Sequence, residues 1–152
     1  MKVIIDTNLW ISYLISEKLN GLKYLCLDRC FSVFYCDEII EEFVRISNKP
    51  KIKKHGIEER HISAVVNLIR THCIKAEIKN VSGYAVRDPK DIYLLVLADV
   101  VNADFLLTGD KDLLILKLHN QTKIISYSKF MVKYKSFLWR IKRFIIKYLR
   151  IF

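Results

Sequence analysis

Short, continuously apolar segments alternate with longer amphipathic segments along most of the chain. The short segments are rich in β-branched and aromatic residues and predict strands at 2–6, 31–36, 73–78, 104–108 and 123–127. The segments between them predict helices, most clearly at 37–47, 57–72 and 88–101. Strands buried on both faces read as continuous apolar runs. The pattern therefore predicts an α/β fold, a three-layer α/β/α sandwich with a central parallel sheet.

The composition is that of one globular domain with a short appendage. The 152 residues are 52% hydrophobic and 28% charged and include only 4 glycines and 2 prolines, which argues against disorder and low complexity. We expect a domain over residues 1–130 and a basic amphipathic helix over residues 131–152. Neither a signal-peptide pattern nor an uncharged apolar run of about 18 residues is found. We therefore expect a cytoplasmic protein with reduced cysteines.

Positive charge is concentrated at one end of the sequence. Residues 1–112 contain 16 basic and 16 acidic residues, whereas residues 113–152 contain 10 basic residues and no acid. Apolar residues recur every three or four positions over 133–152, which predicts an amphipathic helix. Its apolar stripe is expected to pack on the domain or on a second subunit.

Two alternatives remain for this tail. Its basic face could follow an RNA backbone, or the helix could lie on an anionic membrane surface or in a partner's groove. A second basic cluster lies near residue 50 of the sequence. The residues predicted to contact RNA are Lys51, Lys53, Lys54, Arg140, Lys142 and Arg143.

Carboxylates follow the predicted strands at the points where those strands end. Asp6 follows the first strand, Asp110 follows the strand at 104–108, and Glu41 and Glu42 lie one helical turn beyond the second strand. Because the carboxyl ends of parallel strands meet at one edge of a sheet, these acids are expected to converge. Clustered carboxylates repel one another, and Mg²⁺ or Mn²⁺, which bind carboxylate oxygens, would resolve that repulsion.

Simpler roles are open for several of these acids. Asp88 and Asp110 each precede a predicted helix and could serve only as N-caps. Periodicity does not decide whether Glu41 or Glu42 faces the predicted site. A functional role is expected most strongly for Asp6, because a carboxylate at the end of an apolar strand is costly to bury unless something binds it.

Four motifs resemble those of the PIN domain family, in particular the VapC-like toxin components of toxin–antitoxin systems. The motifs are IIDTN at 4–8, EIIEEFVRI at 38–46, RDPKDIYLLVLA at 87–98 and LLTGDKDLL at 106–114. They occur in the family's order, and the resemblance covers residues 1 to about 130. It implies an α/β/α sandwich that carries a metal-dependent ribonuclease site.

The resemblance also implies roles for individual positions. Asp6, Asp91 and Asp110 would bind Mg²⁺ or Mn²⁺, and Glu42 would be the remaining catalytic acid, which accepts a proton from the attacking water. A further group of residues would support these four by hydrogen bonding, by helix capping or by reaching the metal. The supporting residues are Asn8, Thr108, Asp88 and Asp112.

We therefore expect an endoribonuclease that acts on single-stranded or structured RNA, is neutralised by a cognate antitoxin protein, and forms a homodimer. Two alternatives are open. One is a module on the same fold that binds RNA or protein without cutting. The other is an aspartate-dependent phosphatase of the haloacid dehalogenase type. Such phosphatases place a second acid two residues after the nucleophile, a position that Asn8 occupies here relative to Asp6.

Overall fold

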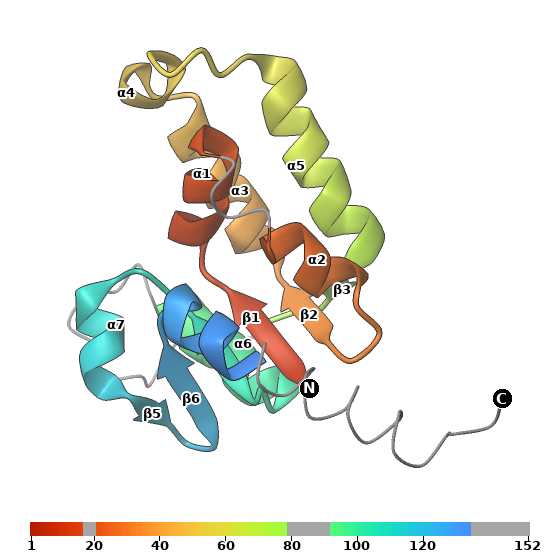
Figure 1. Ribbon diagram of the computed structural model, residues 1–152, viewed down its shortest axis with the longest axis vertical. Helices are drawn as coiled ribbons and strands as arrows, with labels where there is room; N and C mark the ends of the chain where they lie inside the picture. Colours follow the sequence, from red (N-terminus) through yellow and green to blue (C-terminus); the bar gives the residue numbers. More distant parts are fainter. Residues whose placement is uncertain (17–20, 79–91, 135–152) are drawn as a thin grey trace, which may run out of the picture.

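Figure 1 shows the computed structural model, which describes residues 1–16, 21–78 and 92–134. Six strands form one sheet: β1 Lys2–Ile5, β2 Ser32–Tyr35, β3 Ile74–Lys75, β4 Phe105–Leu107, β5 Leu118–His119 and β6 Thr122–Ile125. The helices of these ranges are α1 Thr7–Ile15, α2 Gly21–Leu27, α3 Asp37–Ser47, α4 Pro50–Lys53, α5 Glu59–His72, α6 Ile92–Val101 and α7 Lys111–Leu116. Residues 127–134 are also helical.

The strand order is β3-β2-β1-β4-β6-β5, and the pairs β2–β3, β1–β2, β1–β4 and β4–β6 are parallel. The predicted parallel sheet is thus confirmed for all five expected strands. The sequence did not predict β5, which pairs antiparallel with β6 as a two-residue edge strand. The chain adds strands on one side of β1 first and then on the other side, so the order of the sheet reverses between β1 and β4. That reversal places a crevice at the carboxyl ends of these two strands.

Burial along the central strands confirms the three-layer arrangement. Val3, Ile4 and Ile5 in β1 are at most 1% exposed, and every residue of β4 is also buried. Successive side chains of a strand point to opposite faces, so three consecutive buried residues require cover on both faces of the sheet. Helix α6 contacts β1 and β4, while α1, α2, α3 and α5 pack against one another (Figure 1).

Helix α6 is mostly apolar. Its residues Leu94 to Ala98 are consecutive and all buried, as expected for a helix enclosed by other elements. The predicted helical start at Asp88 lies outside the described residues. The first residues of the predicted C-terminal helix belong to the helical segment 127–134, where Phe130 and Tyr134 pack against Phe31. The division of the chain at residue 130 stays a prediction.

Two helix starts differ from the sequence pattern. The side chains of Thr7 and Asn8 suit the N-cap of α1, but the N-cap residue is Asp6, whose side chain accepts a hydrogen bond from the backbone amide of Asn8. Asp37 has the chemistry of an N-cap for α3, but Cys36 holds that position, and the Asp37 carboxylate instead forms an ion pair with Lys75 at 2.8 Å. No helix of the described ranges is long and apolar enough to cross a membrane.

Candidate functional site

Asp6 lies at the turn between β1 and α1, on the reversal point of the sheet. The β1 ladder continues through its backbone amide, which donates to the Leu107 carbonyl of β4 at 2.9 Å. The carboxylate then caps α1, with the Asn8 amide 3.2 Å from Oδ1. Only 3% of Asp6 is exposed, so the fold buries an acid at the carboxyl edge of its two central strands.

Thr108 connects the two acids that follow β1 and β4. Its Oγ1 donates to Asp6 Oδ2 at 2.5 Å and accepts from the backbone amide of Asp110 at 2.9 Å. The Asp110 carboxylate caps α7 by accepting from the amides of Asp112 and Leu113. The Asn8 side-chain amide lies 3.5 Å from Asp6 Oδ2 and completes the contacts of that carboxylate. One buried hydroxyl therefore fixes the acid of β1 relative to the loop after β4.

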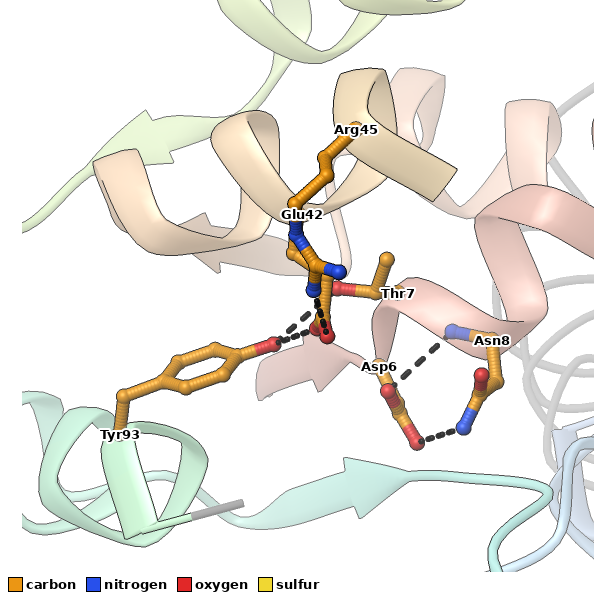
Figure 2. Close-up of polar contacts among 6 residues, drawn as sticks. All are labelled: Asp6, Thr7, Asn8, Glu42, Arg45 and Tyr93. Carbon is orange, nitrogen blue, oxygen red and sulfur yellow. Dashed lines mark hydrogen bonds and ion pairs between the residues drawn. The ribbon is translucent and has the colours of Figure 1, made fainter. Parts of the chain in front are cut away.

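Glu42 projects from α3 toward the same edge and is held by two donors (Figure 2). The Tyr93 hydroxyl donates to Glu42 Oε2 at 2.6 Å, and the Arg45 guanidinium pairs with Oε1 at 3.1 Å. The Thr7 hydroxyl lies 3.1 Å from the Tyr93 hydroxyl. Side chains of α1, α3 and α6 thus form one polar network beside Asp6.

The electrostatics of Asp6 follow from this placement. Burial raises the pKa of the Asp6 carboxyl above its usual value, because an ion loses solvation in the interior. Hydrogen bonds from Thr108 and Asn8 lower that pKa, and the negative charges of Glu42 and Asp110 raise it. Burial and the hydrogen bond to Glu42 also raise the pKa of the Tyr93 phenol, which therefore stays a neutral donor. Among the described residues, the charged side chains that shift the pKa of Asp6 are both acidic.

Two clefts open at this edge. One, of about 580 Å³, is lined by Asn8, Leu9, Ser12, Gly109, Asp110, Lys111 and Asp112. The other, of about 280 Å³, is lined by Glu38, Glu41, Glu42, Arg45 and Tyr93. Their polar side chains offer oxygen and nitrogen atoms and neither a thiol nor an imidazole. Such a donor set suits a hard divalent cation.

The structure brings five of the predicted site residues together: Asp6, Asn8, Glu42, Thr108 and Asp110. Asp112 lines the larger cleft, and Glu41 is exposed beside Glu42. The other two acids, Asp88 and Asp91, lie outside the described residues. Within the described ranges, no group of three or more His, Cys, Asp or Glu side chains is placed to hold a metal ion.

The predicted basic residues are separate from this edge. Lys51 and Lys53 belong to α4, and Lys54 is its C-cap residue. Helix α4 follows the C-terminal end of α3, which is the end away from the sheet (Figure 1). None of the three lines either cleft. Arg140, Lys142 and Arg143 lie outside the described residues. Contact between any of these side chains and RNA stays a prediction.

Sequence reasoning missed Thr7, Arg45 and Tyr93. Arg45 comes three residues after Glu42, a spacing at which side chains on a helix meet. The only sequence signal for Tyr93 is that a hydroxyl-bearing side chain occurs near the start of a mostly apolar helix. Neither signal indicates that the two side chains bind the same carboxylate.

Comparisons with known proteins agree with this fold. The solved structure of VapBC2 from Rickettsia felis bound to a DNA fragment from their promoter is similar to this chain, with a TM-score of 0.52 and 13% sequence identity. The alignment covers 83% of this chain and 98% of that one. No curated protein matches the chain. The family model described as PIN domain matches residues 2–112. This match spans most of the sequence and includes the described residues of the site, and the chain therefore belongs to the PIN domain family.

Proposed function

We propose that this protein is a ribonuclease that hydrolyses phosphodiester bonds in RNA and depends on Mg²⁺ or Mn²⁺. The observation that carries the proposal is the buried Asp6 carboxylate, whose pKa is raised by burial and further by the charges of Glu42 and Asp110. An acid in this environment gains most from a cation beside it. Membership of the PIN domain family favours a nuclease over the phosphatase alternative.

Asp6 and Asp110 would hold the ion, together with Asp91 from outside the described residues. Two described carboxylates suffice for this assignment, because Mg²⁺ commonly binds one or two carboxylates and keeps several waters. The bound ion would supply an activated water and stabilisation of the departing oxygen. Thr108 and Asn8 keep the Asp6 carboxylate in place by donating hydrogen bonds to it.

Glu42 is available to accept a proton, since its carboxylate caps no helix and is bound to the network beside Asp6. It is held beside Asp6 by Tyr93 and Arg45 rather than by backbone amides. A carboxylate within reach of a water molecule can act as a general base. Arg45, on the rim of the smaller cleft, offers a positive charge near which an RNA phosphate could lie.

The test is cleavage of labelled single-stranded RNA with Mg²⁺, with Mn²⁺ and with chelator. Asp6→Asn removes the charge of the central acid and should abolish cleavage. Asp104→Asn is the matched control, because Asp104 accepts a hydrogen bond from the Lys2 amide at the opposite edge of the sheet. The proposal is supported if the wild type and Asp104→Asn cleave RNA in a metal-dependent way and Asp6→Asn does not. Equal cleavage by Asp6→Asn would contradict it and point to a contaminating nuclease.

We further propose that the protein is the toxin of a toxin–antitoxin pair and forms a homodimer. The motif resemblance and the structural similarity to VapBC2 support this assignment. Expression in a bacterial host should arrest growth, and the Asp6→Asn variant should not. Co-expression with the protein encoded beside it should restore growth and yield a co-purifying complex. Light scattering of the purified chain at micromolar concentration should report a dimer, and a monomer would contradict that part.

A further inference from the structure

Tyr93 occupies an unusual place in its helix. The five buried residues that follow it, Leu94 to Ala98, form an apolar stretch inside the molecule. Tyr93 instead directs its hydroxyl at the neighbouring helix α3, where it meets the carboxylate of Glu42 (Figure 2). Phenylalanine would supply the same ring for packing. What tyrosine adds is the hydroxyl group, and that group contacts the proposed site.

The proton positions follow from the donors available. The Tyr93 hydroxyl carries one hydrogen, and an ionised carboxylate can only accept. The hydrogen is therefore committed to Glu42 Oε2, at 2.6 Å. It follows that the Thr7 hydroxyl donates to the Tyr93 oxygen across 3.1 Å. Thr7 is 1% exposed and adjoins Asp6, so this chain of hydrogen bonds begins beside the buried acid and ends on Glu42.

The two oxygens of Glu42 are held differently. Oε2 is bound by a half-buried phenol that is itself fixed by Thr7. Oε1 is bound by Arg45, whose side chain is 60% exposed, so this ion pair is weak and exchanges readily with solvent. One oxygen is anchored by the fold. Among the residues that the structure describes, the other is contacted by a side chain that can leave.

We infer that Tyr93 is a positioning residue for Glu42: its hydroxyl fixes Oε2, so that Oε1 is the oxygen that meets water and substrate when Arg45 moves away. The inference rests on the proposed ribonuclease function. It assigns Tyr93 a role in the rate of reaction and none in binding RNA. Catalytic groups act efficiently when a neighbouring side chain holds them in one orientation.

The test is steady-state RNA cleavage by Tyr93→Phe, Tyr134→Phe and the wild type. Tyr134→Phe is the matched control, because the Tyr134 hydroxyl also donates to a carboxylate, that of Asp28. That pair lies near Met1, at the opposite edge of the sheet from Asp6. Both variants lose a phenol–carboxylate hydrogen bond, so urea unfolding should show similar losses of stability for both.

Tyr93→Phe should lower kcat about tenfold or more and leave KM within about twofold, while Tyr134→Phe should leave both unchanged. In a Glu42→Gln background, adding Tyr93→Phe should change kcat much less, since the residue through which Tyr93 acts is already altered. This double-mutant cycle separates positioning from general loss of structure.

The opposing outcomes are distinct. If the wild type cleaves RNA and Tyr93→Phe keeps its kcat, or raises only KM, the inference fails and the proposed function stands. The inference also fails if Tyr93→Phe lowers kcat equally with and without Glu42→Gln. If the wild type cleaves no RNA with either metal while remaining folded, the proposed function fails and this inference falls with it.

Discussion

The Thr108 hydroxyl lies 2.5 Å from the carboxylate of Asp6, although 102 residues separate the two in sequence. Both side chains are buried, and they come from the ends of the two strands between which the order of the sheet reverses. The same hydroxyl accepts from the Asp110 amide. A single side chain therefore satisfies a buried acid and orients the loop that carries a second one.

Thr108→Val should destabilise the protein at neutral pH by about 1–3 kcal/mol, because it leaves a buried carboxylate and a backbone amide without their partner. The loss should shrink at low pH, where Asp6 is protonated. Urea unfolding between pH 3 and 8 measures both effects. Thr122→Val is the control, since the buried Thr122 hydroxyl donates only to the neutral Ala103 carbonyl. A cost that depends equally on pH in both variants would contradict the explanation.

Asp6→Asn should make the metal-free protein more stable at neutral pH. Burial raises the pKa of folded Asp6, so the native state binds this proton more tightly than the unfolded chain does. The stabilisation from protonated Asp6 is complete below the unfolded pKa and is lost as the pH rises through the folded one. Each unit by which folding raises the pKa corresponds to about 1.4 kcal/mol in the free energy of unfolding. Urea unfolding in chelator should show the advantage of Asp6→Asn at pH 7 and its disappearance toward pH 3.

Asparagine has one acceptor oxygen where aspartate has two, so it keeps either the N-cap of α1 or the bond from Thr108. The cost of the lost contact should not depend on pH, so the change of the stability difference with pH isolates the charge. Asp104→Asn removes an exposed carboxylate instead and should not reproduce the pH-dependent advantage. If the stability of Asp6→Asn relative to the wild type did not rise between pH 3 and pH 7, the buried charge would be compensated within the fold. The expected need for a cation at this position would then disappear.

Mn²⁺ should stabilise the wild type, and removing it should reverse the effect. A cation that binds only the folded state adds about 2.7 kcal/mol when its free concentration is 100 times Kd. Asp6→Asn and Asp110→Asn should each abolish this gain, and Asp104→Asn should retain it. Calorimetric titration measures the affinity for Mn²⁺, and thermal unfolding measures the gain in stability that the bound ion produces. Equal stabilisation of all four proteins would place the metal elsewhere.

Many of the acids at this edge of the sheet could be predicted from the sequence, because the apolar runs that form strands show where each strand ends. Asp6 and Asp110 each follow an apolar run, and a parallel sheet gathers such positions at one edge. The choice between Glu41 and Glu42 could not be made in this way. It depends on the direction in which α3 presents each side chain to Tyr93, a contact across 51 residues.

Elements without a periodic pattern were also missed. Strand β5 contains only Leu118 and His119, too few to show alternation, and it forms because a turn at Asn120 folds the chain back onto β6. Cys36 holds the N-cap of α3, although Asp37 has the right chemistry for a cap. Its partner Lys75 comes from β3, which is distant in sequence.

Ser47→Ala should stabilise the protein. Ser47 ends α3 with 0% exposure, and within the described residues its hydroxyl has no hydrogen-bond partner. A buried hydroxyl left unpaired costs about 1–3 kcal/mol, and part of that cost should be recovered when alanine replaces it. Alanine also has a higher helix propensity than serine, by about 0.5 kcal/mol. Ser63→Ala, at an exposed position of α5, measures the propensity effect alone. In urea unfolding, Ser47→Ala should gain more stability than Ser63→Ala, and an equal or smaller gain would show that the Ser47 hydroxyl is hydrogen-bonded in solution.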